Sequence, residues 1–254
     1  MATKEGTKNR APILTYHSID NSGSIISTSY EKFIRQMNYL TDSSFRVISL
    51  EEITTCILEN RPFPSKSVAI TFDDGYKNVY DIAYPVLKEK GFGATVFVIP
   101  EYCCGYDQWN RQGKRIPQLE LLNSNEISEM ARNGIDFGAH TMSHPDLSKL
   151  PLDKAAAEIL TSKAAIKNYS GKEVQFFAYP FGRQTKEISK IVKKEFYGAC
   201  STELGFATLR SDIYSLPRID MYYFSRNNFF TWIETSLFSH YIRLRNMLRI
   251  LKGT

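Results

Sequence analysis

The chain has 254 residues, of which 43% are hydrophobic and 23% charged, and its formal net charge is +5. This composition excludes a disordered or fibrous protein and fits a globular chain with one sizeable core. The charge is mild and no basic run accompanies it, so a nucleic-acid partner is not expected. No stretch reaches the length that crosses a membrane.

The cysteines and the first residues bear on the cellular compartment. Cys56, Cys103, Cys104 and Cys200 form no Cys-x-x-Cys pair, and adjacent cysteines rarely bridge each other comfortably. This usage favours a reducing compartment. Residues 1–10 are polar and lack the apolar core of a signal peptide. If the chain starts natively there, a cytoplasmic protein is predicted.

Apolar periodicity divides most of the chain into alternating strands and helices. After a flexible leader at residues 1–11, strands are expected at residues 12–16, 47–49, 68–72, 94–99, 135–139, 174–179, 198–201 and 215–219. Helices are expected at residues 33–40, 49–58, 78–90, 126–132, 153–169 and 186–196, with a long irregular loop at 101–123. This alternation predicts a parallel sheet, and seven or eight such units favour its closure into a barrel.

Two adjacent carboxylates follow the apolar strand at residues 68–72. Asp73 and Asp74 come directly after it, and Gly75 comes next. Adjacent carboxylates at the end of a buried strand repel each other unless a cation or a proton lies between them. Taken alone, Asp-Asp-Gly is more typical of a solvated turn.

Two histidines farther along the chain strengthen the case for a cation. His140 and His144 are four residues apart, a separation that places both imidazoles on one side of a helical turn. Such a pair suits Zn²⁺, with a carboxylate from elsewhere as third ligand and water in the open position. The same ligands also suit Co²⁺, Ni²⁺ or Fe²⁺.

Three motifs together resemble those of the polysaccharide deacetylases, also called carbohydrate esterase family 4. They are Thr-Phe-Asp-Asp-Gly at 71–75, His-Thr-Met-Ser-His-Pro at 140–145 and, in part, Ala-Tyr-Pro-Phe-Gly at 178–182. The resemblance spans roughly residues 12–220. It implies an α/β fold, a distorted and incomplete (β/α) barrel of about seven strands in a single domain. We assign the barrel to residues 12–225.

The resemblance also implies roles for individual residues. Asp74, His140 and His144 would hold a divalent metal that lowers the pKa of its bound water and polarises the substrate carbonyl. Asp73 would be the general base, and the backbone N–H of Phe181 would help to bind the oxyanion. These residues follow the C-terminal ends of predicted strands, which is the catalytic face of a β/α barrel.

The third motif departs from the family pattern. The family has an arginine that orients the catalytic aspartate, but this chain has Ala178 there. Arg218, near the end of the last predicted strand, is expected to supply the guanidinium instead, and Arg183 competes for that role. A surface or inter-helix salt bridge is the alternative for Arg218.

The general acid is expected near the start of the chain. The family's usual acid is a histidine close to the C-terminal end of the domain, but the flanking pattern is missing around His240. Residues 14–17, Leu-Thr-Tyr-His, instead resemble the N-terminal Tyr-His strand of the poly-N-acetylglucosamine deacetylases. His17 would then protonate the leaving amine. A buried structural histidine is the alternative.

Aromatic residues are candidates for substrate contact, because their faces stack well on sugar rings. Tyr179 lies in the third motif, and Tyr106 and Trp109 lie in the long loop, where packing against the barrel is an equally good explanation. The basic and aromatic residues 226–254 predict an amphipathic helix packed on the barrel. Peripheral contact with the inner membrane face is the alternative.

The sequence therefore predicts a metal-dependent hydrolase that removes N-acetyl groups from amino sugars. Its substrate would be an N-acetylated oligo- or polysaccharide, or a lipid- or nucleotide-linked precursor. One alternative is hydrolysis of a non-sugar amide or imide at the same metal site. The other is an inactive glycan-binding module, which Ala178 favours and the intact Asp-His-His set opposes.

Overall fold

The computed structural model describes residues 9–109, 118–224 and 228–252. Seven parallel strands form a closed ring in which each strand pairs with the next. In order around the ring they are β2 (Ile13–Tyr16), β12 (Leu216–Asp220), β10 (Gly198–Leu204), β9 (Phe176–Ala178), β8 (Ile135–Ala139), β7 (Ala94–Val98) and β6 (Ser67–Phe72), which pairs again with β2. The expected barrel of about seven strands in one domain is confirmed.

The barrel is uneven around its circumference. The ladder between β8 and β9 consists of one residue pair, Ala139 with Phe177, and the register between β10 and β12 shifts between Cys200 and Leu204. A complete (β/α) barrel has eight strands. The ring is therefore both distorted and one strand short. A further short strand, β5 (Arg46–Val47), pairs in parallel with the first two residues of β6, Ser67 and Val68.

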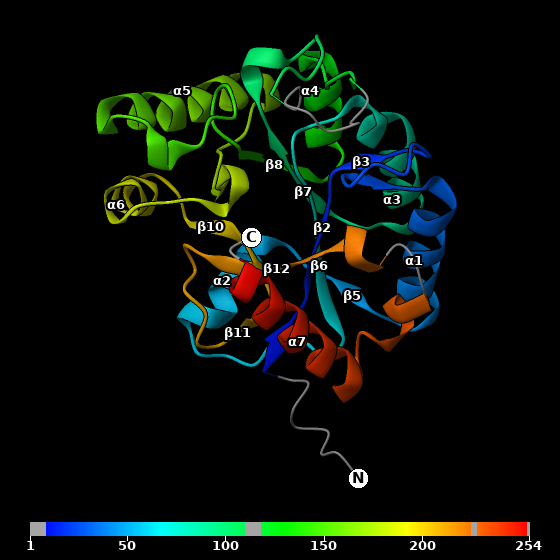
Figure 1. Cartoon of the computed structure of the whole chain (residues 1–254). Coiled ribbons are helices and arrows are strands. Elements are labelled where there is room, and N and C mark those ends of the chain that lie inside the picture. The colour runs from blue at the N-terminus through cyan, green and yellow to red at the C-terminus, as the bar shows by residue number, and fades with distance from the viewer. Residues whose placement is uncertain (1–8, 110–117, 225–227, 253–254) are drawn as a thin grey trace.

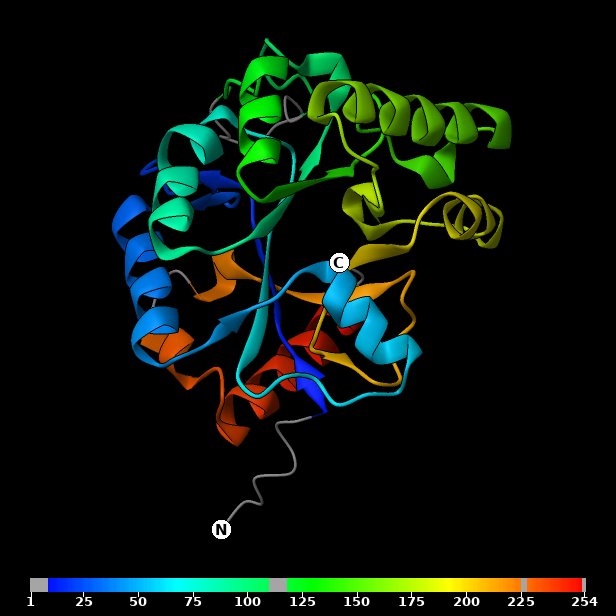
Figure 2. The ribbon, with the colours of Figure 1, turned by 180° about the vertical axis from the view of Figure 1, so that it is seen from behind.

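The strands are surrounded by helices, as the two opposite views in Figures 1 and 2 show. The α-helices are α1 (Tyr30–Asp42), α2 (Leu50–Leu58), α3 (Tyr84–Lys90), α4 (Ser124–Arg132), α5 (Leu152–Ser170), α6 (Lys186–Glu195) and α7 (Ser236–Lys252). None of them combines the length and the apolar character needed to cross a membrane.

The helix expected at residues 78–90 begins differently from an ideal α-helix. Its first part, Val79–Ala83, is a π-helix in which the Tyr84 N–H donates to the Val79 carbonyl, five residues back. Pro85 follows directly, and proline has no N–H for an α-helical bond to Asp81. The wider turn accommodates that missing donor.

Two residues of the expected flexible leader at residues 1–11 form a strand. Residues 1–8 lie outside the described part of the chain, but Arg10–Ala11 form β1, which pairs antiparallel with β11 (Ala207–Thr208). Ala11 is fully buried, and the Arg10 guanidinium stacks 4.5 Å from the Phe206 ring centroid. Packing on both sides of the backbone therefore orders these two residues.

The core beneath β2 and β6 is aromatic. Tyr16 and Phe72 end these two strands, are paired in register, and stack with 5.4 Å between ring centroids. Phe33 of α1 packs edge-on against Tyr16 at 5.3 Å, and the Tyr16 hydroxyl donates to Gln36. Each fully buried ring contributes about 1.5–3 kcal/mol. This packing fixes the position of the residues that follow the two strands.

One face of α7 packs against the barrel. Phe238 is buried with its ring centroid 4.8 Å from that of Phe224, and Ile242 is buried one turn later. The C-terminal residues expected to be amphipathic thus include a docked helix. The side chains of Phe229, Arg249 and Lys252 lie outside the described part.

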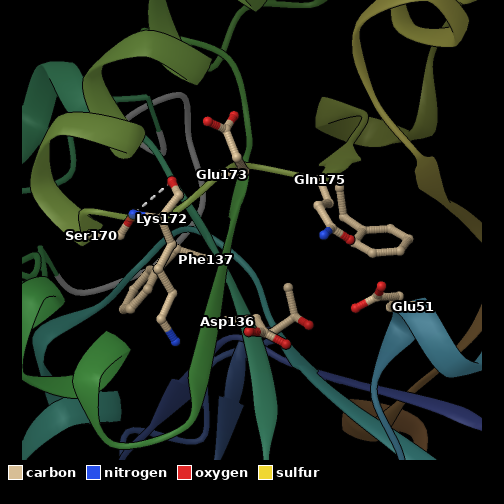
Figure 3. A pocket seen from close by; sticks show the side chains of 9 residues that line it. Glu51, Asp136, Phe137, Ser170, Lys172, Glu173 and Gln175 are labelled. Carbon is tan, nitrogen blue, oxygen red and sulfur yellow. Dashed lines mark hydrogen bonds between the residues drawn. The ribbon is translucent and has the colours of Figure 1, made fainter.

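A pocket opens at the N-terminal ends of β7, β8 and β9 (Figure 3). Its volume is about 170 Å³. The lining residues are Glu51, Thr95, Asp136, Phe137, Ser170, Lys172, Glu173, Gln175 and Phe176.

Candidate metal centre and catalytic site

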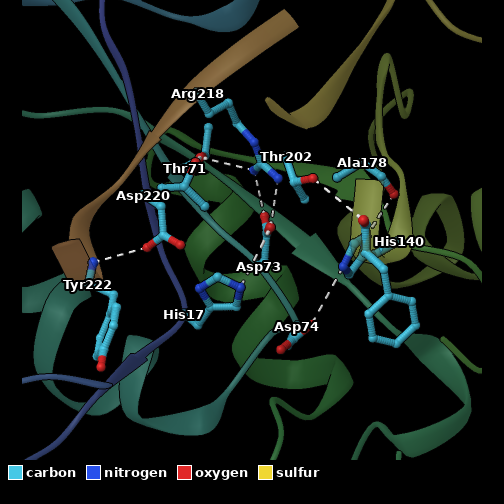
Figure 4. A network of polar contacts seen from close by, with 12 residues as sticks. His17, Thr71, Asp73, Asp74, His140, Ala178, Thr202, Arg218, Asp220 and Tyr222 are labelled. Atoms are coloured by element: carbon cyan, nitrogen blue, oxygen red, sulfur yellow. Dashed lines mark hydrogen bonds and ion pairs between the residues drawn. The ribbon is translucent and has the colours of Figure 1, made fainter. Parts of the chain in front are cut away.

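The polar residues predicted for the site come together at the C-terminal ends of the strands (Figure 4). His17 follows β2, Asp73 and Asp74 follow β6, His140 follows β8, and Arg218 lies in β12. All but His17 are more than nine-tenths buried. Parallel strands end on the same side of a barrel, so residues far apart in the sequence meet there.

Asp74, His140 and His144 form a buried cluster that could hold a metal ion. The Nε2 atoms of the two histidines each lie 3.5 Å from Asp74 Oδ1. One donor atom from each of the three residues lies within 4.8 Å of the other two. Two imidazoles and one carboxylate are the ligands of many three-residue zinc sites.

The backbone carbonyl of Ala178 orients His140 toward this cluster. Its Nδ1 lies 2.7 Å from the Ala178 carbonyl, an acceptor, so Nδ1 carries the proton and donates it. In the neutral imidazole the lone pair is then on Nε2, which faces Asp74 (Figure 4). Metal-binding histidines usually have this arrangement. His144 Nδ1 is buried without a hydrogen-bond partner among the described residues.

The protonation equilibria also suit a cation. Burial alone would raise the pKa of Asp74, but the His140 hydrogen bond and the nearby histidine charges hold it below its usual range. Burial lowers the pKa of His144 to about 3, which leaves a neutral imidazole. Burial also opposes a charge on His140, yet the bond to Asp74 and the Asp73 charge raise its pKa. A proton shared between His140 and Asp74 lies where a divalent metal would lie, so a bound metal would replace that proton.

The second carboxylate of the pair, Asp73, faces an arginine. Arg218 Nη1 donates to Asp73 Oδ1 at 2.7 Å and Nη2 donates to Oδ2 at 2.8 Å. The Arg218 Nε donates to the Ser201 carbonyl at 3.0 Å. Burial by itself would raise the pKa of Asp73, but the guanidinium outweighs it and holds that pKa below its usual range.

The competing arginine lies elsewhere. Arg183 is exposed and forms an ion pair with Asp146. Of the two arginines considered from the sequence, the fold brings Arg218 to Asp73. A salt bridge on the surface is therefore excluded for Arg218, which is 4% exposed.

His17 lies beside Asp73 on the solvent side of the cluster. Its Nε2 is 3.9 Å from Asp73 Oδ2, and its side chain is 25% exposed. The neighbouring β2 and β6 strands set this distance, because Tyr16 and Phe72 directly precede the two residues. His240 is an exposed residue of α7.

Aromatic rings flank His144 on two sides. Its ring centroid lies 5.1 Å from that of Trp109 and 4.8 Å from that of Phe181. Tyr102 extends the Trp109 side, with 5.1 Å between their centroids. Phe181 is 53% exposed and has a left-handed backbone with φ of 58°.

The other two predicted aromatic contacts differ from each other. Tyr106 exposes half of its surface and forms an isolated β-bridge with Glu120. Tyr179 is fully buried and packs edge-on against Phe177 at 5.1 Å. Its expected substrate contact is corrected, because a side chain without exposed surface belongs to the core.

Sequence reasoning missed the backbone acceptors of the site. The carbonyls of Ala178 and Ser201 orient His140 and Arg218. Every residue has a carbonyl, so no residue type marks these positions. The only signal in the sequence was that Ala178 stands where the family has an arginine. That difference marked the position, but it did not indicate that the backbone carbonyl there would accept a hydrogen bond.

Known proteins resemble this chain in sequence. A family model described as polysaccharide deacetylase matches residues 60–198. YxkH of Bacillus subtilis (strain 168), which carries the name polysaccharide deacetylase, is 32% identical over 211 residues, covering 83% of this chain and 71% of that protein. A poly-β-1,6-N-acetyl-D-glucosamine N-deacetylase of Staphylococcus aureus (strain MRSA252) is 29% identical over 205 residues, covering 76% and 67%.

Solved structures share the fold. The Streptococcus pyogenes deacetylase PplD, solved in complex with acetate, superimposes with a TM-score of 0.72 at 27% identity, covering 84% of this chain and 93% of that chain. IcaB from Ammonifex degensii gives a TM-score of 0.70 at 24% identity, covering 83% and 91%. With the family model matching more than half of its length, this chain belongs to the polysaccharide deacetylase family.

Proposed function

We propose that this protein is a metal-dependent hydrolase that removes N-acetyl groups from amino sugars. The substrate is an N-acetylated oligo- or polysaccharide, or its lipid- or nucleotide-linked precursor. The observation that carries the proposal is the buried Asp74–His140–His144 cluster beside a carboxylate, Asp73, paired with Arg218. The deacetylase names of the relatives add support.

The metal would be held by Asp74, His140 and His144. Zn²⁺ is the first candidate, and Co²⁺, Ni²⁺ and Fe²⁺ accept the same ligands. When bound, a divalent ion supplies a Lewis acid for the acetyl carbonyl and makes a water molecule more acidic.

Asp73 is the general base in this proposal. The Arg218 charge keeps its carboxylate ionised, and each carboxylate oxygen has a lone pair left after accepting from the guanidinium. The two parallel hydrogen bonds also fix the plane of the carboxylate. Asp73 can therefore accept a proton from water in one defined direction.

His17 is the general acid. It lies across from Asp73 and is partly exposed, so its imidazole can reach a sugar nitrogen that enters from solvent. An amine is a poor leaving group unless it is protonated, and that proton is what His17 would donate. The backbone N–H of Phe181, next to His144, is the candidate donor to the oxyanion.

The aromatic residues around the site favour a sugar over a small non-sugar amide. Phe181 and Tyr106 are each 53% exposed, and Trp109 lies against His144. Exposed rings offer faces on which sugar rings stack, and a site for a small amide has no need of them. An inactive glycan-binding module is disfavoured, because the cluster and the Asp73–Arg218 pair are complete.

We also propose that α7 contacts an anionic membrane surface at its outer face. Leu237, Leu244 and Leu248 are exposed and spaced seven and four residues apart, which places them on one side of the helix. Residues 236–254 contain four basic residues and no acidic one. Apolar side chains flanked by positive charges suit a negatively charged bilayer.

The membrane contact can be tested by co-sedimentation with vesicles. Binding to vesicles that contain phosphatidylglycerol, but not to pure phosphatidylcholine, is expected, and Leu244→Glu should abolish it. Leu160→Glu, at an exposed leucine of α5, is the matched control. Equal recovery of wild type and Leu244→Glu with the vesicles would argue against a role for α7.

Acetate release tests the catalytic function. Purified protein is incubated with N-acetylglucosamine oligomers, with a chelator and with added Zn²⁺. Release that the chelator stops and Zn²⁺ restores is the expected result. Bound metal without release from any oligomer would point to a lipid- or nucleotide-linked substrate or to a non-sugar amide. Absence of bound metal would favour the binding module.

A further inference from the structure

The loop that carries both histidines is held in an unusual backbone conformation. This histidine loop, residues 140–145, contains two non-glycine residues with left-handed backbone, Thr141 with φ of 66° and His144 with φ of 63°. Each such residue costs about 1 kcal/mol or more. Contacts elsewhere must therefore stabilise this conformation.

A carboxylate outside the cluster binds the middle of the loop. Glu158 Oε2 accepts hydrogen bonds from the backbone N–H groups of Met142 and Ser143, both at 2.9 Å. Its Oε1 accepts from the Ser143 hydroxyl at 2.8 Å. No lysine or arginine pairs with Glu158 in the described ranges, so the loop donors are its polar partners. Hydrogen bonds to an ionised acceptor are about twice as strong as neutral ones.

Glu158 connects the loop to a helix of the fold. It lies in α5, which packs against both β8 and α4 (Figure 1). The other hydrogen bonds in the middle of the loop are between neutral groups. The His144 N–H donates to Thr141 Oγ1 at 3.0 Å, and the Glu101 N–H donates to the Met142 carbonyl at 3.1 Å. Among the described residues, Glu158 is thus the charged acceptor for the backbone N–H groups of Met142 and Ser143, and it holds them from a helix.

We infer that Glu158 is a positioning residue of the metal centre: it sets the separation of His140 and His144 by clamping the two peptide groups between them. This inference rests on the proposed metal site. Without the carboxylate, the Met142 and Ser143 amides lose their acceptor and the loop can relax from its left-handed conformation. The imidazoles then no longer face Asp74 together.

The test is metal affinity, measured apart from activity. Zn²⁺ binding to the wild type and to Glu158→Ala, Glu158→Gln and Glu158→Asp is followed by competition with a chromophoric chelator, at a temperature where each variant is folded. Outer-sphere partners of metal ligands typically contribute 10–100-fold in affinity. We expect a loss of this size for Glu158→Ala and Glu158→Gln. Glu158→Asp, which keeps the charge and both oxygens, should recover part of it.

Two further measurements separate positioning from general stability. Thermal unfolding of the metal-free variants reports the fold alone, and hydrogen exchange reports the Met142 and Ser143 amides, which should exchange faster without Glu158. Glu187→Ala, at an exposed residue of α6, is the matched control and should leave Zn²⁺ affinity and both amides unchanged.

The outcomes are distinguishable. Wild-type affinity within twofold in folded Glu158→Ala and Glu158→Gln would overturn this inference while leaving the proposed metal site intact. A wild type that binds no Zn²⁺ would overturn both. Weakened binding in these two variants, with partial recovery in Glu158→Asp and none of these changes in Glu187→Ala, would support the positioning role.

Discussion

Arg218 and Asp73, 145 residues apart in the sequence, form two parallel hydrogen bonds of 2.7 and 2.8 Å in the interior of the barrel. The pair joins β12 to the end of β6 and lies next to the Asp74–His140–His144 cluster. Ala178 occupies the position at which the family motif has an arginine, and its carbonyl orients His140. The guanidinium thus reaches the aspartate from another strand.

Removing the guanidinium should destabilise the protein. Arg218→Met leaves Asp73 as a buried carboxylate without its charge partner, which costs about 3–5 kcal/mol in comparable pairs. Arg218→Lys keeps the charge but loses the planar fork, so a smaller loss is expected. Urea unfolding measures the loss of unfolding free energy in each of the two variants. Arg183→Met, at the exposed pair with Asp146, is the control and should cost at most about 1 kcal/mol.

The Arg218 effect should depend on pH in a defined direction. The pKa of Asp73 is lowered in the folded state, so the pair stabilises the fold above the ordinary aspartate pKa. This contribution is lost as the pH falls through the lowered value. The stability difference between wild type and Arg218→Met should therefore shrink in acid. A difference that grows in acid would contradict the assigned ion pair.

The two adjacent aspartates should respond differently to the same substitution. Asp73→Asn removes the proposed base and should lower kcat by about 10²–10⁴-fold, with metal content unchanged. Asp74→Asn removes a proposed ligand and should lower the metal content itself. Acetate release together with elemental analysis separates the two effects. Full turnover in Asp73→Asn would refute the proposed mechanism.

The role of His17 can be tested through the leaving group. A general acid is needed for an amine but hardly for a phenolate, which departs without a proton. His17→Gln should therefore slow hydrolysis of an N-acetylated sugar by about 10²–10⁴-fold, and slow an activated aryl acetate far less. Equal losses on both substrates would indicate a structural role for His17 instead.

The cysteines should differ in their reactivity toward iodoacetamide. Burial raises the pKa of Cys103, and that of Cys200, to about 12, so both remain protonated thiols at pH 8. Cys104 is exposed. Mass spectrometry after brief labelling should find Cys104 modified first, and labelling in urea should remove the difference. Modification of Cys103 as fast as Cys104 in the folded protein would contradict this burial.

The same burial predicts weaker stability in base. A thiol whose pKa is raised on folding stabilises the fold below the ordinary thiol pKa. That contribution is lost as the pH rises through the folded value. Urea unfolding of the wild type should show stability falling above about pH 9, and the fall should be smaller in Cys200→Ala.

The local parts of the structure could be predicted from the sequence. The apolar runs before His17, Asp73 and His140 indicated strands, and parallel strands place the residues after them at one end of a barrel. Short-range spacing also indicated the His140–His144 pair, because four residues return to the same side of a turn. These features depend on residues that are close together in the sequence. A hydrophobic period or a short motif is therefore enough to predict them.

Contacts between distant segments were decided only by the tertiary structure. The choice of Arg218 over Arg183, the Ala178 carbonyl on His140 and the Glu158 clamp depend on which strands and helices become neighbours. The burial of Tyr179 depends on the same packing. The sequence by itself determined the residue types at the strand ends. It also determined the alternation of apolar strands and helices that predicts a barrel. Which side chains and carbonyls meet there follows from the packing of strands and helices, because this packing brings Arg218 to Asp73 across 145 residues and Glu158 to Met142 across 16.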